Sequence, residues 1–175
     1  MTQIQGISEV SLQRDCMQEA DTASLAKQLA GSFEQYIEQN PSGHINISLV
    51  GDLGAGKTTF TRHLIQSMGF AGKVKSPTYT LCEPYSLTLN QKTYSGHHFD
   101  LYRMRDPLEW QEAGFVELFD TPGFCIIEWP EKAGGTLPAF DIQIEMLAGA
   151  DENERSIRIS ALSTLGANII QTMAR

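Results

Sequence analysis

The segment GDLGAGKTTF, residues 51–60, combines three glycines, one lysine and two threonines. Gly51, Gly56, Lys57 and Thr58 match every specified position of the pattern G-x-x-x-x-G-K-[ST]. Glycine lets backbone N–H groups turn inward without steric cost, and the lysine adds a positive charge. The segment therefore predicts a phosphate-binding loop for a nucleotide, which we call the P-loop and define as residues 51–58.

Each part of the P-loop has an expected task. The backbone N–H groups of residues 54–57 and the positive end of a following helix would surround the phosphates. Lys57 would reach the β- and γ-phosphates, and the Thr58 hydroxyl would bind Mg²⁺. The residues expected to contact the nucleotide here are Gly51, Asp52, Leu53, Gly54, Ala55, Gly56, Lys57, Thr58 and Thr59.

Two other interpretations fit this segment less well. A tight surface turn with a solvated lysine would not need a strand before it and a helix after it. A dinucleotide-binding G-x-G-x-x-G pattern would begin at Gly54, but Thr59 occupies the position of its third glycine. We therefore prefer the nucleotide-binding P-loop.

Two carboxylates at the ends of expected strands are candidates for a magnesium site and for catalysis. Asp100 stands in HHFDLYR at 97–103, and Glu128 follows the apolar run 124–127. Because the strand before Glu128 is the more apolar one, we expect Glu128 beside the Mg²⁺. Asp100 would then position either water or the metal, in the second case through the ligand shell of the metal. A helix cap or a surface charge is the alternative for each acid.

The neighbours of these acids have simpler expected roles. His97 and His98 are adjacent, and adjacent residues of a strand point to opposite faces, so we expect one to be packed and the other solvated. No third ligand stands at a metal-site spacing from them. Trp129 would either shield the site or fill the core.

Hydrophobic spacing predicts the elements that must position the P-loop. A helix is expected over about 22–39 with Asp21 as its cap, and a strand over 45–50 leads into Gly51. A second helix is expected after the P-loop, with Gly69 as its stop. Strand, loop and helix in this order are the context that the P-loop pattern requires.

The rest of the chain alternates between strands and short helices. One hairpin is expected from strands 79–85 and 93–100 around the polar segment LTLNQK, and another from strands 141–147 and 156–161. Between the hairpins, the run 124–127 predicts a buried central strand.

Two helices complete this expectation. Asp106 as N-cap, Pro107 at the first helical position and Glu109 in a capping box predict a short helix that breaks near Gly114. A closing helix is expected over 163–174. The predicted fold class is α/β, with a single P-loop NTPase-like domain over residues 1–175 and a mixed central β-sheet flanked by helices.

The composition agrees with one such domain and limits the expected cellular location and partners of the protein. Hydrophobic residues make up 41% of the 175, without an apolar run long enough to cross a bilayer. The first fifteen residues lack a secretory pattern, so we expect a cytoplasmic protein with no membrane partner. The formal net charge of −8 opposes direct binding to a phosphate backbone, so any nucleic-acid contact would be indirect.

The type of nucleotide enzyme is narrowed by two comparisons of motifs. The tetrad 120–123 resembles the D-x-x-G switch of GTPases, but no N-K-x-D guanine reader follows it, so we prefer ATP to GTP. A P-loop small-molecule kinase is the alternative function. Such kinases usually carry an arginine-rich lid, and here Arg103 and Arg105 alone cluster after Asp100.

Four ordered blocks of this sequence resemble the bacterial TsaE family, the P-loop ATPases of tRNA threonylcarbamoyladenosine synthesis. The blocks are GDLGAGKTTF at 51–60, KSPTYTL at 75–81, HHFDLYR at 97–103 and IIEWPEKAGGTLP at 126–138. The resemblance extends from about residue 20 to residue 162.

The resemblance implies roles for individual residues. Thr58 and Glu128 would serve the Mg²⁺, and Asp100 would serve hydrolysis of ATP to ADP. Ser76 and Thr78, which flank Pro77, would form a nucleotide-sensitive switch, and Trp129 would lie beside the site. It also implies two protein partners, TsaD and TsaB, with tRNA reached only through their complex. Hydrolysis by the isolated chain would be weak and stimulated by these partners.

Overall fold

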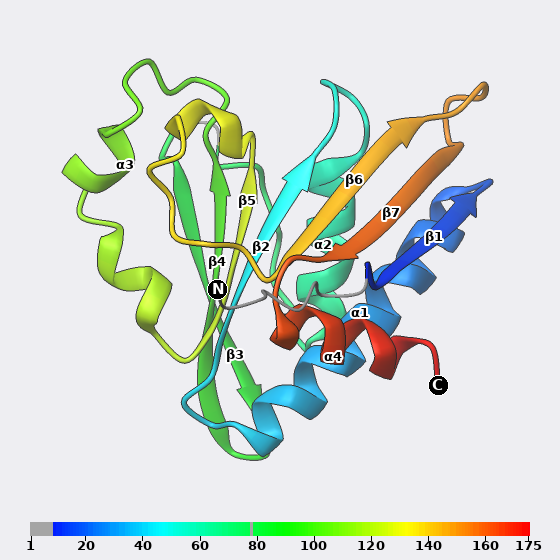
Figure 1. Ribbon diagram of the computed structural model, residues 1–175, viewed down its shortest axis with the longest axis horizontal. Coiled ribbons are helices and arrows are strands. Elements are labelled where there is room, and N and C mark those ends of the chain that lie inside the picture. The colour runs from blue at the N-terminus through cyan, green and yellow to red at the C-terminus, as the bar shows by residue number, and fades with distance from the viewer. Residues whose placement is uncertain (1–8, 78) are drawn as a thin grey trace, which may run out of the picture.

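The computed structural model describes residues 9–77 and 79–175 of the chain. Within these residues the chain forms a seven-stranded sheet in the order β1-β7-β6-β2-β5-β4-β3, with helices packed against it (Figure 1). The strands are β1 (Ser11–Cys16), β2 (His44–Val50), β3 (Cys82–Leu89), β4 (Lys92–Asp100), β5 (Gly123–Glu128), β6 (Ile142–Ala148) and β7 (Arg155–Ala161). The helices are α1 (Glu19–Gln39), α2 (Lys57–Ser67), α3 (Glu109–Glu112) and α4 (Thr164–Met173), with the short 3₁₀ helices η1 (Val116–Asp120) and η2 (Pro130–Ala133).

The centre of the sheet is parallel and its edges are antiparallel. β2 pairs in parallel with β5 and β6, and β5 pairs in parallel with β4. The outer strands β3, β7 and β1 pair antiparallel with β4, β6 and β7 respectively. The carboxyl ends of β2, β4 and β5 therefore meet at one edge, where ligands bind in open α/β sheets. The predicted fold class, an α/β domain with a mixed sheet flanked by helices, is confirmed.

Two hydrophobic clusters hold this sheet, one on each face. β5 is buried along its whole length and sends Phe124 and Ile126 toward α1, α2 and α4. It sends Cys125 and Ile127 to the other face, where Trp110 of α3 is also buried. A strand buried on both faces is typical of the centre of a parallel sheet. The prediction of a buried central strand at 124–127 is confirmed.

The N-terminal segment differs from the expectation in two ways. α1 begins at Glu19, and the Asp21 carboxylate accepts hydrogen bonds from the backbone N–H groups of Met17 and Gln18. Asp21 therefore lies inside the first turn, and its prediction as the cap of a helix from about 22 was wrong. β1 was not expected at all, because its exposed, polar residues lack an alternating pattern; its partner β7 lies at the other end of the chain.

The hairpin of β3 and β4 is shifted along the chain from its predicted position. β3 begins at Cys82, and residues 79–81 are outside it. Asn90 and Gln91 alone form the turn, with φ of 50° and 65°. Two successive residues with positive φ are typical of a tight type I′ hairpin turn, so the remainder of LTLNQK extends the strands.

The capped helix expected at Asp106 starts later than predicted. α3 covers four residues from Glu109, while the Asp106 carboxylate accepts the Leu108 N–H at 2.8 Å in the turn before it. Pro107 is therefore not the first helical residue. Gly114, with φ of 83°, ends the helix as expected.

The C-terminal half of the prediction agrees with the structure. β6 and β7 form the second hairpin, and α4 follows with Ser163 as its N-cap, whose Oγ accepts the Gly166 N–H at 3.1 Å. Within the described part of the chain, no helix has the length and apolar character needed to cross a membrane.

Candidate nucleotide-binding site

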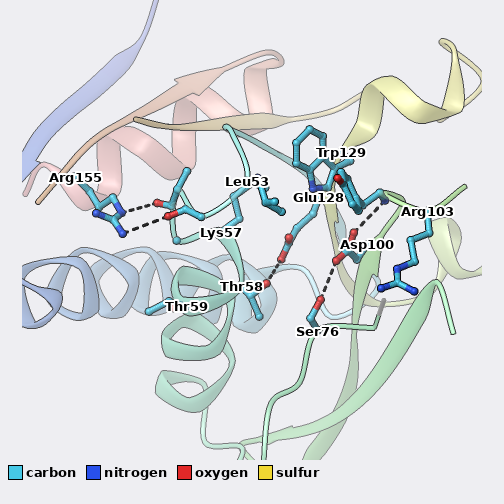
Figure 2. A pocket seen from close by; sticks show the side chains of 14 residues that line it. Leu53, Lys57, Thr58, Thr59, Ser76, Asp100, Arg103, Glu128, Trp129 and Arg155 are labelled. Carbon is cyan, nitrogen blue, oxygen red and sulfur yellow. Dashed lines mark hydrogen bonds between the residues drawn. The ribbon is translucent and has the colours of Figure 1, made fainter. Parts of the chain in front are cut away.

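A cavity of about 580 Å³ lies at the sheet edge where β2, β4 and β5 end (Figure 2). β2 ends at Val50 and α2 begins at Lys57, so the P-loop joins the two at the mouth of the cavity. The residues that line it are Leu53, Gly54, Ala55, Gly56, Lys57, Thr58, Thr59, Ser76, Asp100, Tyr102, Arg103, Glu128, Trp129 and Arg155. The predicted site residues therefore meet in space, apart from Gly51 and Asp52, which do not line the cavity, and Thr78, which lies outside the described residues.

Close approach of the backbone explains the first and last glycine of the P-loop. A Cβ on Gly51 would lie 2.5 Å from the carbonyl oxygen of Met146 in β6. Gly56 has a φ of 97°, and a Cβ there would lie 3.3 Å from Nε of Arg155. A side chain at Gly51 would therefore prevent the packing against β6, whereas at Gly56 the positive φ favours glycine and a Cβ would make a tight contact with Arg155.

Lys57 is held inside the P-loop. Its side chain is buried, and Nζ donates to the carbonyl oxygens of Gly51 and Asp52. Nζ also lies 4.2 Å from the centroid of the Trp129 ring. Burial lowers the pKa of the ammonium, and the nearby carboxylates of Glu128 and Asp100 oppose this shift. Gly51 and Asp52 therefore hold the lysine through their carbonyls rather than by lining the cavity.

A hydroxyl and a carboxylate meet on the side of the cavity beside α2. Thr58 Oγ1 donates to Glu128 Oε1 at 3.0 Å, and Glu128 is only 3% exposed. His98 Nε2 lies 2.9 Å from the same carboxylate oxygen, and His98 is fully buried. Oxygen ligands of these two kinds are those that Mg²⁺ takes in phosphate-binding sites. We call Thr58, Glu128 and His98 the magnesium side.

Asp100 connects the end of β4 to the loop that follows α2. Its Oδ2 accepts from Ser76 Oγ at 2.8 Å, and its Oδ1 accepts from the Tyr102 N–H at 3.0 Å. Asp100 is 6% exposed, so its position is fixed by these partners and by the sheet. The acid expected to act in hydrolysis thus contacts the expected switch residue Ser76.

Trp129, Tyr102 and Arg103 line the rest of this cavity, and Tyr79 lies against Arg103 without lining it. Trp129 has a φ of 57° directly after β5, a left-handed conformation that is rare for residues other than glycine. Its ring lies 4.9 Å from that of Tyr102, between centroids, and the Arg103 guanidinium lies 4.4 Å from the ring centroid of Tyr79. We call Ser76, Tyr79, Asp100 and Arg103 the switch side.

The comparison with known protein families assigns this chain. The profile described as "Threonylcarbamoyl adenosine biosynthesis protein TsaE" matches residues 16–157. The chain belongs to the TsaE family. The resemblance expected from the four sequence blocks, over about 20–162, is therefore confirmed.

Individual members of the TsaE family and one solved structure agree with this assignment. The tRNA threonylcarbamoyladenosine biosynthesis protein TsaE of Haemophilus influenzae is 45% identical over 130 residues, which cover 74% of this chain and 78% of that protein. The protein of the same name from Bacillus subtilis is 34% identical over 129 residues, 74% of this chain and 77% of that protein. The crystal structure of YdiB, from Bacillus subtilis, has a TM-score of 0.74 with 26% identity and covers 97% of this chain and 98% of its own. These similarities do not favour the small-molecule kinase alternative.

Five residues in or beside this TsaE-family site were missed or misjudged from the sequence. His97 and His98 are both buried, so the expectation that one is solvated was wrong. The spacing H-x-D of His98 and Asp100 could have indicated a shared face of β4. Tyr102 and Arg103 follow Asp100 directly, which was an available signal. Arg155 had none, because it reaches the P-loop from 100 residues along the chain.

Proposed function

We propose that this protein binds ATP and Mg²⁺ in the cavity and hydrolyses the ATP during synthesis of N6-threonylcarbamoyladenosine at position 37 of tRNA. Family membership supports the pathway, since the relatives are named as biosynthesis proteins of this nucleoside. The observation that carries the enzymatic part is the contact between Thr58 and Glu128 beside the P-loop. In this proposal residues 1–175 act as one P-loop ATPase domain.

Phosphate binding is assigned to the P-loop and the start of α2. The first backbone N–H groups of a helix have no partner within it, and its positive end favours anions. A phosphate chain in the cavity would accept from the N–H groups of Gly54 and of residues 56–59 and from the Lys57 ammonium. Lys57 would exchange the carbonyl oxygens of Gly51 and Asp52 for phosphate oxygens.

Magnesium binding is assigned to Thr58 and Glu128. Both present oxygen atoms at the same point of the cavity wall, which fits the preference of Mg²⁺ for oxygen ligands. A bound Mg²⁺ would neutralise negative charge on the β- and γ-phosphates. Thr58 would bind it through the hydroxyl oxygen, and Glu128 would bind it or a water of its shell. His98 would keep the Glu128 carboxylate oriented.

Hydrolysis is assigned to Asp100, with Ser76 and Thr78 as the switch. Asp100 is buried at the cavity and can accept a hydrogen bond from an attacking water. Ser76 donates to Asp100, so a γ-phosphate that attracted the Ser76 hydroxyl would release the carboxylate toward water. The Arg103 guanidinium lies over the Tyr79 ring, and it would have to leave this ring to stabilise charge on a transferred phosphate. We therefore propose that the isolated chain hydrolyses ATP weakly.

The proposed partners are TsaD and TsaB, with tRNA contacted only through them in the cytoplasm. A chain of net charge −8 is a poor ligand for a polyanion on its own, which favours an indirect role. The partners would stimulate ATP hydrolysis by fixing the residues of the switch side in their active arrangement. ATP hydrolysis would then allow repeated rounds of threonylcarbamoyl transfer.

Reconstitution of the modification tests this function. The chain is mixed with TsaD, TsaB, the TsaC synthase, ATP, threonine, bicarbonate and unmodified tRNA, and the modified nucleoside is counted per TsaD. We expect many turnovers with this chain and about one without it or with Lys57→Ala. Equal turnover without the chain would refute the proposed role, and transfer of phosphate to a metabolite would support the kinase alternative instead.

A further inference from the structure

Arg155, the first residue of β7, bridges the P-loop and the turn between β6 and β7. Its Nε donates to the Ala55 carbonyl at 2.7 Å, and Nη2 lies 3.3 Å from the Gly54 carbonyl oxygen. On the other side, Nη1 donates to the carbonyl oxygens of Glu152 and Glu154, both at 2.7 Å. Figure 2 shows the guanidinium approaching the P-loop from the side opposite Glu128 and Asp100.

We infer that Arg155 is a positioning residue for the phosphate-binding backbone and that it couples the turn 149–154 to nucleotide affinity. This inference rests on the proposed binding of ATP. Arg155 lines the cavity, but its hydrogen bonds to the P-loop go to carbonyl oxygens, whereas the phosphates would contact the N–H groups of the loop.

The planarity of the peptide bond explains how an arginine that holds the carbonyls of the loop also orients its N–H groups. In a trans peptide the carbonyl and the next N–H point in opposite directions. Arg155 holds the Ala55 carbonyl, so the Gly56 N–H of the same peptide points away from the guanidinium. The neighbouring peptide is held at both ends, because Arg155 contacts the Gly54 carbonyl and the Ala55 N–H donates to the Asp52 carbonyl at 3.0 Å.

The residue types on both sides fit this arrangement. A guanidinium has a rigid, planar set of donors, so Nε and Nη2 can address two successive carbonyls at once, which an ammonium cannot do with the same geometry. Gly56 packs directly beside the guanidinium, since a Cβ there would lie 3.3 Å from Nε, which is a tight contact. Arginine at 155 and glycine at 56 are therefore matched.

The turn that anchors Arg155 is itself well ordered by hydrogen bonds. The Gly149 N–H donates to the Glu154 carbonyl at 2.7 Å, and the Glu154 carboxylate accepts from the N–H groups of Ala150 and Asp151 at 2.9 and 3.2 Å. A cavity of about 120 Å³ separates this region from the start of α1 and includes Gly56, Asn153 and Arg155 in its lining. A displacement of the turn would therefore be transmitted through Arg155 to the P-loop.

The test compares two arginines of β7. Arg158 is exposed and lines a separate cavity with Gln13 and Glu145, so Arg158→Ala is a matched control. We expect Arg155→Ala to weaken ATP binding about tenfold by calorimetry, which corresponds to about 1.4 kcal/mol. Arg155→Lys, which keeps the charge, should lose about threefold, and Arg158→Ala should stay within twofold.

A second measurement distinguishes positioning from a purely structural role. In the wild-type chain, ATP should slow amide hydrogen exchange in residues 149–154, and this response should be lost in Arg155→Ala. Wild-type affinity and response in folded Arg155→Ala would refute the inference, while absence of ATP binding by the wild-type chain would refute the proposed function itself. If Arg155→Ala does not fold, Arg155→Lys decides: unchanged affinity and exchange response refute the inference, and weaker binding at unchanged stability supports it.

Discussion

The two sides of the cavity are built in different ways. On the magnesium side, Thr58, Glu128 and His98 belong to α2, β5 and β4, and one carboxylate oxygen of Glu128 is contacted by both neighbours. On the switch side, Asp100 ends a strand, but Ser76 and Tyr79 belong to the loop after α2. Tyr79 is 84% exposed, whereas His98 is fully buried.

This difference indicates which half of the site is preorganised. Side chains on packed strands and helices keep their geometry, so the magnesium side needs little rearrangement when a ligand arrives. The switch side depends on a loop whose described residues are mostly exposed, with Val74 and Pro77 as buried anchors. Loops of this kind can change with the nucleotide or with a partner. We therefore expect variants of the magnesium side to change hydrolysis and its Mg²⁺ dependence, and variants of the switch side to change mainly the stimulation by partners.

The largest effect is expected where both sides meet, at Lys57. Lys57→Ala removes the ammonium that would pair with the phosphates, and charge-assisted hydrogen bonds of this kind contribute about 1.5–3 kcal/mol each. We expect ATP affinity to fall at least about a hundredfold by calorimetry, in a variant that circular dichroism shows to be still folded. Lys132→Ala, which changes an exposed lysine of η2, is the control. Retained affinity in Lys57→Ala would exclude the phosphate-binding role of the P-loop.

The next effect tests the magnesium side. Glu128→Gln keeps the shape of the side chain and removes its charge, so we expect hydrolysis to fall about a hundredfold while ATP binding changes by less than about fivefold. Phosphate release and calorimetry measure the two quantities. Glu131→Gln, on an exposed carboxylate nearby, should resemble the wild-type chain. Turnover of Glu128→Gln at the wild-type rate would show that the magnesium-side acid has been misassigned.

The difference between the two sides also explains what the sequence could predict. The P-loop is a local pattern between a strand and a helix, and Glu128 ends an apolar strand that is buried on both faces. Each of these signals is contained in a segment of about ten residues. The fold class and the main candidate site residues could therefore be predicted from the sequence.

Contacts between residues far apart in the chain could not be predicted from such local patterns. Arg155 reaches the P-loop across 100 residues, and Ser11 of β1 pairs with Ser160 of β7. Neither pairing has a local signature, because the edge strand is polar and exposed and the arginine contacts backbone oxygens. The shifted hairpin has another cause: its turn uses Asn90 and Gln91 without the glycine that usually marks a type I′ turn.

A smaller effect is expected for His98, which acts through Glu128. Residues that orient metal ligands typically contribute about tenfold or more to metal affinity or activity. We expect His98→Leu to raise the Mg²⁺ concentration for half-maximal hydrolysis about tenfold, and His98→Gln, which can still donate to Glu128, to restore part of it. His97→Gln is the control, because His97 is buried on the opposite face of the same strand. An unchanged Mg²⁺ dependence in His98→Leu would leave His98 with a packing role only.

The smallest effect is expected on the switch side, from Ser76→Ala. Ser76 is exposed, so water can replace its charge-assisted hydrogen bond to Asp100, and the Asp100 carboxylate keeps its contact with the Tyr102 N–H. We therefore expect about a threefold change in basal hydrolysis and no change in Mg²⁺ dependence, with Ser86→Ala, at an exposed position of β3, as the control. With TsaD and TsaB present, the stimulation of hydrolysis should fall further than the basal rate, because the partners would act by fixing the loop that carries Ser76. A Ser76→Ala variant that behaved like Glu128→Gln would mean that the switch side is as rigid as the magnesium side, and the contrast between the two would not hold.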